Sequence, residues 1–222
     1  MFIPQPLRSK PVPFDHSDFL FENKYDGFRA LAVIESGRCK LVSRNGNEFK
    51  AFALLASSIG STVRGSAVLD GEVVCLDEHG HPRFNDLLFH RFEPCFVAFD
   101  ILSLNGKDLR WNALVERKGE LRRLLGFKQE RILYEQHVER EGCRFFELIC
   151  QRDLEGIVAK MKHGHYTSDL DESTWIKVKN RGYSQAKGRA EFFNREKPPK
   201  SVYAGWETCA LICEDMAVEA RV

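Results

Sequence analysis

Short apolar runs with a strand-like composition are spread irregularly along the chain, and turn residues separate them. These runs are residues 30–34, 39–43, 67–69, 72–76, 96–102, 156–160 and 174–179. The first two are joined by Glu35-Ser36-Gly37-Arg38, which is a hairpin signal. Strands that outnumber the helices and do not alternate with them regularly favour antiparallel pairing. The sequence therefore predicts an α+β fold built on antiparallel sheets.

A smaller number of segments have the apolar spacing of an amphipathic helix. Their apolar faces are Phe49, Phe52, Leu55 and Ile59; Leu114, Leu121, Leu124 and Leu125; and Phe145, Leu148 and Ile149. Gly126 directly follows the second set, which predicts that this helix ends there. We expect these helices to flank the sheets.

Composition excludes several classes of protein. The chain has 222 residues, of which 43% are hydrophobic and 29% are charged, as in ordinary globular proteins. This length suits one large domain or two small ones. The longest strongly apolar run, residues 95–102, is far too short to span a membrane, and the first residues lack the pattern of a signal peptide, so we expect none. Seven cysteines without a CxxC pair favour reduced thiols, so we expect a cytoplasmic protein without membrane contact.

Charge is balanced over the whole chain and uneven near its end. The net charge is +1, so binding of nucleic acid would need a local basic patch. Residues 181–200 carry six Lys or Arg against two Glu, and residues 201–222 carry one Arg against four acidic residues. The basic stretch is either a solvated helix or linker, or a surface that contacts phosphates. Residues 1–20 contain four prolines and are expected to form an extended lead-in.

Common catalytic signatures are absent from the sequence. It contains no phosphate-binding P-loop, no GxGxxG, no HExxH and no GxSxG. Two His-Gly-His triplets occur, at His79 and His81 and at His163 and His165. Each is interpreted as a polar turn rather than a metal site, because no further ligands follow at a convincing spacing.

Six short segments instead combine the residue types that nucleotidyl transfer needs. They are residues 22–29 (ENKYDGFR), 43–46 (SRNG), 69–74 (LDGEVV), 96–102 (FVAFDIL), 155–160 (EGIVAK) and 175–179 (WIKVK). In the last segment the period of a strand sends Lys177 and Lys179 to one face. A neutral lysine amine can attack the α-phosphorus of a nucleoside triphosphate, and cations and a divalent metal can stabilise the charge that develops.

The ordered set of segments resembles the covalent nucleotidyltransferases and, within them, the ATP-dependent DNA ligases. Residues 24–29 match the KxDGxR motif of that family, and the other segments follow in its order. The motif sequences are most similar to those of the ligase domain of bacterial end-joining ligase D. The similarity includes Tyr183-Ser184-Gln185 and Gly188-Arg189 after the last motif. The match covers about residues 20–190. It implies an ATP-grasp-like nucleotidyltransferase fold, with antiparallel sheets flanked by helices and the nucleotide in the groove between them.

The resemblance also implies roles for single residues. Lys24 would carry AMP as a covalent lysyl adenylate, and Glu155 and Glu72 would hold Mg²⁺ or Mn²⁺. Glu22 would border the adenine pocket, largely through its backbone, and Phe99 would stack on the base. The remaining predicted ATP contacts are to the ribose or the phosphates, and they come from Arg29, Arg44, Glu72, Lys177 and Lys179.

Several of these positions also have a plain structural interpretation. Phe99 lies in an apolar strand, so it is also interpreted as an aromatic residue of the core. Trp175 is interpreted as a packing residue rather than a functional one. Lys160 fits two interpretations about equally well: a contact to phosphate or DNA, or an ordinary surface lysine. Asp26 is expected to orient its own turn or Lys24, or to form a salt bridge with Arg29.

The chain departs from the ligase pattern after its last lysine motif. Only 43 residues follow Lys179, too few for the five-stranded OB domain that closes such ligases over the nucleotide. We therefore expect a domain of residues 21–180 that adenylates itself and passes AMP to the 5′-phosphate of nicked DNA in repair. Residues 181–222 would be a short extension, and a protein partner could supply the missing lid. The alternatives are a non-catalytic nucleotide- or DNA-binding accessory, or an RNA ligase.

Overall fold

A six-stranded sheet forms one half of the molecule. The computed structural model describes residues 2–126 and 131–186. The sheet has the order β4-β3-β5-β6-β7, and β8 pairs with β6 off this path. Its strands are β3 (Phe28–Glu35), β4 (Arg38–Ser43), β5 (Ala67–Val74), β6 (Cys95–Leu104), β7 (Lys107–Asp108) and β8 (Ile132–Tyr134). The predicted hairpin is confirmed between β3 and β4, where Ser36 and Gly37 take positive φ angles of 50° and 76°.

One expectation for this sheet is wrong. Residues 67–69 and 72–76 were expected as two strands, but β5 runs without a break across Asp70-Gly71. Gly71 permits this because β6 approaches it closely: an added Cβ would lie 2.4 Å from Phe96 Cζ and 2.5 Å from the Val97 carbonyl oxygen. A glycine inside an apolar run thus marks a close backbone approach rather than a turn.

A five-stranded sheet, in the order β1-β11-β10-β2-β9, forms the other half. Its strands are β1 (Arg8–Ser9), β2 (His16–Asn23), β9 (Val138–Arg140), β10 (Gly156–Met161) and β11 (Trp175–Lys179). β1 and the first part of β2 fall within residues 1–20, the segment expected as an extended lead-in. Except for the parallel pairs β1–β11 and β6–β8, the pairing is antiparallel, which confirms the predicted α+β class.

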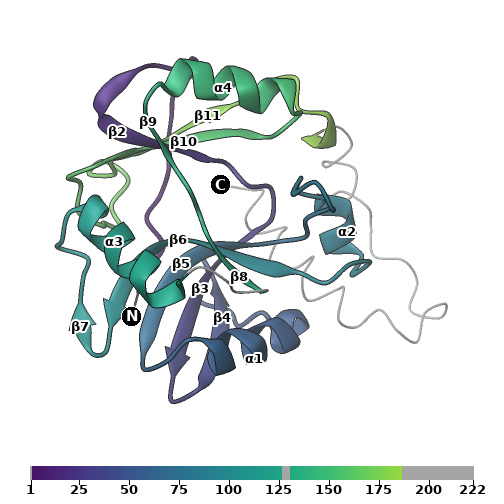
Figure 1. The fold of residues 1–222 in the computed structure, drawn as a ribbon, viewed down its shortest axis with the longest axis vertical. Helices are drawn as coiled ribbons and strands as arrows, with labels where there is room; N and C mark the ends of the chain where they lie inside the picture. Colours follow the sequence, from purple (N-terminus) through teal and green to yellow (C-terminus); the bar gives the residue numbers. More distant parts are fainter. Residues whose placement is uncertain (1, 127–130, 187–222) are drawn as a thin grey trace.

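Helices flank the two sheets (Figure 1). The helical segments are η1 (Lys50–Phe52), α1 (Ala53–Thr62), α2 (Phe84–Leu88), α3 (Leu114–Leu125), α4 (Gly142–Gln151) and η2 (Ser184–Ala186). The three predicted helices are confirmed as η1 with α1, α3 and α4. α3 ends at Gly126 as expected, where φ is 63°. The short helix α2 and the short strands β7, β8 and β9 had no clear signal in the sequence.

Buried side chains from both sheets meet between them. Leu31, Val68 and Leu102 from the six-stranded sheet share one apolar cluster with Leu20 and Val158 from the five-stranded sheet. Fully burying a side chain of this size contributes about 1.5–3 kcal/mol. This cluster fixes the spacing of the sheets and hence the width of the groove beside it.

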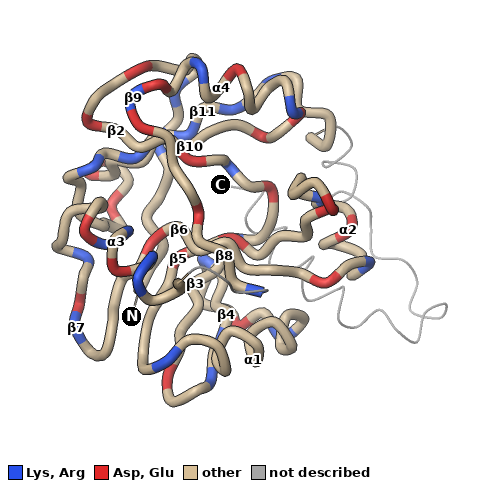
Figure 2. Tube along the Cα trace, viewed as in Figure 1, with Lys and Arg blue, Asp and Glu red and all other residues tan. Residues whose placement is uncertain are grey.

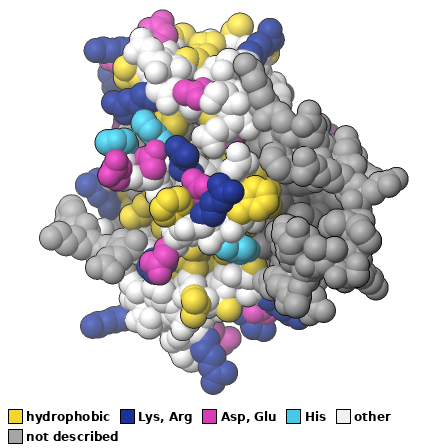
Figure 3. All heavy atoms as spheres, turned by 90° about the vertical axis from the view of Figure 1, so that its right-hand side faces the viewer, with side chains coloured by type: hydrophobic (Ala, Val, Ile, Leu, Met, Phe, Trp, Pro, Cys, Tyr) yellow, Lys and Arg dark blue, Asp and Glu magenta, His cyan; other side chains and the backbone are white. Residues whose placement is uncertain are grey.

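The surface agrees with the balanced composition. Acidic and basic residues are interspersed along the tube in Figure 2. In the face shown in Figure 3, charged side chains of both signs lie among apolar ones. None of the helices in residues 2–126 and 131–186 is long and apolar enough to cross a membrane.

Candidate active site

Lys24 lies where β2 ends, at the edge of the groove between the sheets. Its backbone N–H donates to the Gly156 carbonyl oxygen at 2.9 Å, which fixes the residue beside the start of β10. Its ammonium Nζ donates to Glu155 Oε2 at 2.7 Å. The side chains are 18% and 10% exposed, so both are largely enclosed and still reachable from the groove. The structure thus brings the first and the fifth sequence segments into direct contact.

Glu72 approaches the same point from the opposite sheet. It lies on β5, directly across from Arg29 on β3. Burial raises the pKa of Glu72 to about 8; Lys24 and Arg29 oppose the shift, while Glu155 and Asp26 add to it. Glu72 lines the same pocket as Lys24, and Lys24 contacts Glu155, so the two glutamates approach Lys24 from the two sheets.

Cations surround this pair of glutamates. Lys177 and Lys179 lie on β11 opposite Val158 and Gly156, and Lys179 Nζ is 3.9 Å from Glu155 Oε1. Burial lowers the pKa of Lys177, and the charges of Lys179, Lys24 and Arg44 lower it further. Arg44 is exposed in the turn after β4. The predicted lysine pair thus lies near Lys24, as a site for a triphosphate requires, and the charge of Arg44 acts on Lys177.

A small pocket of about 50 Å³ continues from Lys24 into the groove. Phe99 on β6 and Val158 on β10 line it from the two sheets, together with Trp175. The Phe99 ring packs edge-on against Trp175 with centroids 5.8 Å apart. Phe99 therefore both packs against the core and presents an aromatic surface to the pocket. Trp175 is 1% exposed, which confirms the packing role expected for it.

A buried ion triad closes the inner end of this pocket. Glu22 Oε1 accepts from Lys118 Nζ at 2.5 Å, and Glu22 Oε2 lies 2.5 Å from Lys160 Nζ. Burial alone would raise the pKa of Glu22, but the two lysines bring it below its ordinary value. The same burial, with Lys118 nearby, lowers the pKa of Lys160. Lys160 is 2% exposed, so its interpretation as a surface lysine is wrong.

Lys118 is the member of the triad that sequence reasoning missed. It follows Leu114 by four positions and precedes Leu121 by three, so it lies on the buried face of α3. A charged residue at an apolar position of an amphipathic helix was the available signal. Arg117 occupies a similar position and forms a fully buried pair with Asp100 at 2.8 Å, beside Phe99 in the chain.

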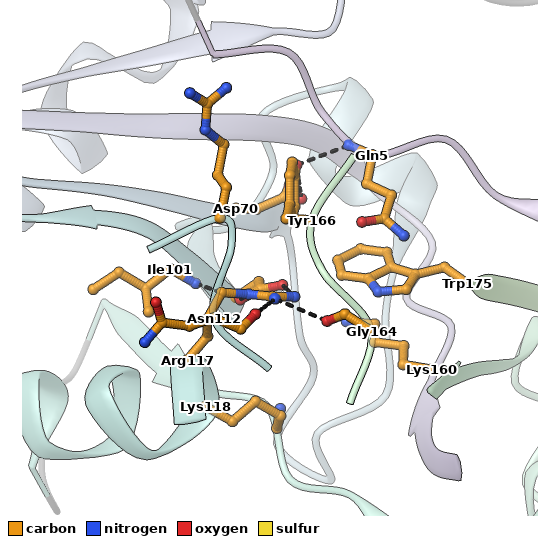
Figure 4. Close-up of polar contacts among 12 residues, drawn as sticks. Gln5, Asp70, Ile101, Asn112, Arg117, Lys118, Lys160, Gly164, Tyr166 and Trp175 are labelled. Atoms are coloured by element: carbon orange, nitrogen blue, oxygen red, sulfur yellow. Dashed lines mark hydrogen bonds and ion pairs between the residues drawn. The ribbon is translucent and has the colours of Figure 1, made fainter. Parts of the chain in front are cut away.

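Arg29 does not pair with Asp26, so that expected salt bridge is wrong. Its guanidinium donates to both carboxylate oxygens of Asp70, at 3.1 and 2.7 Å, and to the Gln5 carbonyl oxygen at 2.6 Å. Tyr166 donates to Asp70 at 2.7 Å and accepts from the Gln5 backbone N–H at 2.8 Å (Figure 4). The N-terminal segment is thereby tied to the floor of the groove, where Arg29 lines the pocket.

The remaining sequence predictions concern the His-Gly-His triplets and the end of the chain. At His79 and His81 the backbone N–H groups both donate to Asp77 Oδ1, which confirms a polar turn. Within residues 2–126 and 131–186, no group of three or more His, Cys, Asp or Glu residues is arranged to hold a metal ion. Gly188-Arg189, most of the basic stretch and all of the acidic stretch lie outside the described residues.

A groove between two mainly antiparallel sheets, with a lysine between two glutamates and a lysine pair, defines the covalent nucleotidyltransferase class. The family model described as "ATP dependent DNA ligase domain" matches residues 10–179. The chain belongs to this family.

The similar proteins include end-joining ligases. The multifunctional non-homologous end joining protein LigD of Pseudomonas aeruginosa is 30% identical over 187 residues, which are 77% of this chain and 22% of LigD. The prophage-derived DNA ligase-like protein LigB of Bacillus subtilis is 27% identical over 193 residues, covering 83% of this chain and 70% of LigB. The chain thus spans about a fifth of LigD and most of LigB.

Solved structures agree with the sequence comparison. A mycobacterial DNA ligase D complexed with ATP and MES has a TM-score of 0.65 and 26% identity, over 80% of this chain and 60% of the other. A Chlorella virus DNA ligase-adenylate, at 17% identity and a TM-score of 0.58, has the same fold. The predicted resemblance and nucleotidyltransferase fold are confirmed.

Proposed function

We propose that this domain adenylates itself with ATP on Lys24 and passes the AMP group to the 5′-phosphate of nicked DNA in repair. The observation that carries the proposal is the contact of Lys24 Nζ with Glu155 at 2.7 Å, inside a ring of further cations and Glu72. In the first step a P–N bond forms between Lys24 and the α-phosphorus. The bond from that phosphorus to pyrophosphate breaks, and the amine loses its proton.

The surroundings of Lys24 suit a nucleophile. Lys177 and Lys179 lie beside Glu155, the partner of Lys24, and supply positive charge for the phosphate oxygens that the amine must approach. Glu155 accepts a hydrogen bond from Nζ, so it holds the amine in place and is within reach of the proton that leaves. The aligned amine needs little further ordering before attack.

The pocket beyond Lys24 marks where the adenosine part of ATP would enter, and at about 50 Å³ it must widen to hold the base. The adenine would lie between Phe99 and Val158, with Glu22 at its inner end, and Arg29 and Glu72 lie where the ribose would pass. A planar base gains from an aromatic face on one side and an aliphatic face on the other. Lys177, Lys179 and Arg44 would contact the phosphates.

The two glutamates suit one divalent cation that arrives with the nucleotide. Mg²⁺ is usually held by one or two carboxylates, with phosphate oxygens and waters completing its shell. Glu72 and Glu155 supply such a pair from opposite sides of the groove, and no third carboxylate joins them in the described part of the chain. Mg²⁺ or Mn²⁺ bound here would neutralise charge on the phosphates.

Membership of the DNA ligase family favours DNA over RNA as the acceptor. It also favours an enzyme over a non-catalytic accessory, since the nucleophile, both glutamates and the lysine pair are all present around one groove. By their names, LigD is a non-homologous end joining protein and LigB is a DNA ligase-like protein. We propose DNA ends or nicks as the substrate and a partner domain as the lid.

Labelling with α-³²P-ATP tests this function. We expect an acid-labile, phosphoramide-linked label on the wild-type protein with Mg²⁺ or Mn²⁺, and none on Lys24→Ala. Lys40→Ala is the matched control, because Lys40 is an exposed lysine paired only loosely with Glu48 at 3.7 Å. Absence of label on the wild type with ATP, in either metal, would refute the proposal. Nick sealing on DNA and RNA duplexes then separates the two acceptors.

A further inference from the structure

Gln5 is a fully buried polar residue near the start of the chain. Its side chain donates from Nε2 to Ser173 Oγ at 3.2 Å and accepts from the Thr167 backbone N–H at 3.0 Å. Its backbone N–H donates to the Tyr166 hydroxyl oxygen at 2.8 Å, and its carbonyl oxygen accepts from Arg29 at 2.6 Å. Buried polar groups need such partners. The N-terminal segment, the connection from β10 to β11 and strand β3 therefore meet at this one residue.

The segment that follows Gln5 continues along the nucleotide pocket. Leu7, two positions further on, lines the pocket. The segment then forms β1, in which Ser9 lies opposite Lys177 of β11. It thus passes from Arg29 at one side of the pocket to a predicted phosphate contact at the other, so its first residues are placed to act on a bound nucleotide.

Arg29 is held from two sides, and part of its guanidinium faces the pocket. Nε and Nη2 donate to the Asp70 carboxylate, and Nη1 donates to the Gln5 carbonyl oxygen. Within the described part of the chain these bonds use three of the five guanidinium N–H groups, so two can donate to a ligand. Arg29 lines the pocket, and its central guanidinium carbon is 5.6 Å from the centroid of the Phe99 ring. A base stacked on Phe99 would therefore bring its ribose within reach of these two N–H groups.

Gln5 closes a ring of hydrogen bonds around the Arg29 guanidinium. The Tyr166 hydroxyl donates to Asp70 Oδ2 at 2.7 Å and accepts from the Gln5 backbone N–H (Figure 4). Arg29 donates to both ends of this chain, at Asp70 and at Gln5. Asp70 and Gln5 are fully buried and Tyr166 is 6% exposed. A fully satisfied buried network of this kind keeps one arrangement, so the direction of the Arg29 side chain depends on Gln5 as well as on Asp70.

We propose that Gln5 is a positioning residue for ATP: by closing the ring around Arg29, it directs the remaining guanidinium N–H groups at a ribose hydroxyl. The N-terminal segment is thereby part of the nucleotide site, and it makes the site prefer ATP to an analogue without that hydroxyl. Such an analogue leaves a largely enclosed N–H group without an acceptor, which lowers its affinity. This inference rests on the proposed binding of ATP in the groove and adds a substrate preference to it.

Equilibrium binding tests this inference without depending on catalysis. In the Lys24→Ala background no lysyl adenylate can form, and calorimetry compares ATP with 2′-deoxy-ATP and 3′-deoxy-ATP. We expect one of the two analogues to bind about tenfold more weakly than ATP, because it lacks a hydrogen bond to a charged donor. Addition of Gln5→Met, which keeps a similar side-chain volume, should weaken ATP binding about fivefold and binding of that analogue less than about twofold. The preference for ATP should then fall to about twofold.

A double-mutant cycle separates positioning from a general structural role. Arg29→Lys should itself remove most of the preference, and Gln5→Met should then weaken ATP binding by less than about twofold more, because its effect passes through Arg29. Tyr166→Phe breaks the same ring and should also reduce the preference, so the test does not depend on the folding of a single variant. Ile3→Ala is the control, because Ile3 is 50% exposed, and it should leave both affinity and preference unchanged.

Three results would overturn the inference. They are equal binding of ATP and both analogues, equal weakening of all three ligands by Gln5→Met, and an effect of Gln5→Met that adds in full to that of Arg29→Lys. Absence of label on the wild type, with the preference for ATP intact, would refute the proposed adenylation and leave this inference supported. Absence of ATP binding would overturn both.

Discussion

Lys24 Nζ and Glu155 Oε2 lie 2.7 Å apart although 131 positions separate the two residues in the chain. The antiparallel pairing of β2 with β10 brings them together, since Glu22 lies opposite Val158 and the Lys24 backbone bonds to Gly156. The proposed nucleophile and its carboxylate partner are therefore adjacent ends of two paired strands. This placement makes their relative position depend on the sheet rather than on a flexible loop.

Removing the Glu155 carboxylate should affect the chemical step most. We expect Glu155→Ala to reduce the rate of lysyl-adenylate formation about a hundredfold, since it loses a hydrogen-bond acceptor for Lys24 and a candidate metal ligand. Quench-flow labelling at saturating ATP measures this rate. Glu139→Ala is the control, because Glu139 also pairs with a lysine but lies on the surface. Equal rates for Glu155→Ala and the wild type would contradict this role.

The buried triad should be important for stability. Lys118→Ala leaves Glu22 with only one of its two lysines and removes the donor to the Glu135 carbonyl oxygen. Breaking a buried pair from one side costs about 3–5 kcal/mol. Urea unfolding should therefore show a large fall in the free energy of unfolding for Lys118→Ala. The exposed Lys40→Ala variant should change it by less than about 1 kcal/mol. A small effect of Lys118→Ala would show that Lys160 alone satisfies Glu22.

The motif residues could be predicted from the sequence because each motif is short and its chemistry is local to its own residues. Lys24, Glu72, Glu155 and the lysine pair were all identified in this way, and the structure brings them around one groove. Their mutual distances could not be predicted, since they depend on which strands pair.

The supporting contacts had weaker signals. The β3–β5 register places Glu72 opposite Arg29 and Asp70 opposite Leu31, and only the side-chain geometry shows that Asp70 is the partner of Arg29. β8 and β9 have three residues each, too few for the alternation of a strand to be visible. The contact between Tyr183 and Asp26 spans 157 positions and depends on a path after β11 that no periodicity describes.

Glu135 should make stability depend on pH. Burial raises its pKa to about 8, with Glu22 adding to the shift and Lys118 opposing it. Between its ordinary value near 4.5 and about 8, the folded state therefore binds more protons than the unfolded state, so stability falls as pH rises through this window. The melting temperature should decline from pH 6 to pH 8.5. Glu135→Gln should remove part of the decline, and a slope unchanged by this variant would contradict the assignment.

Glu72 has a pKa raised in the same direction, to about 8. Glu72→Gln should therefore remove a further part of the fall in melting temperature with rising pH. The effects of the two variants on this fall should add if the groups titrate independently. Exposed Glu78→Gln is the control and should leave the slope as it is in the wild type. The measurement requires metal-free buffer, because a cation bound at Glu72 would displace its proton.

Phe99 should determine affinity for the base rather than the rate of transfer. Loss of a stacking aromatic side chain costs about 1–3 kcal/mol per base. Phe99→Leu keeps an apolar side chain beside Trp175 but removes the ring, so we expect ATP binding to weaken about tenfold. Binding of inorganic pyrophosphate should be unchanged, because its candidate contacts are Lys177 and Lys179. Phe92→Leu is the control, since Phe92 is 63% exposed and does not line the pocket. If both ligands weakened equally, Phe99 would act on the shape of the whole groove rather than on the base.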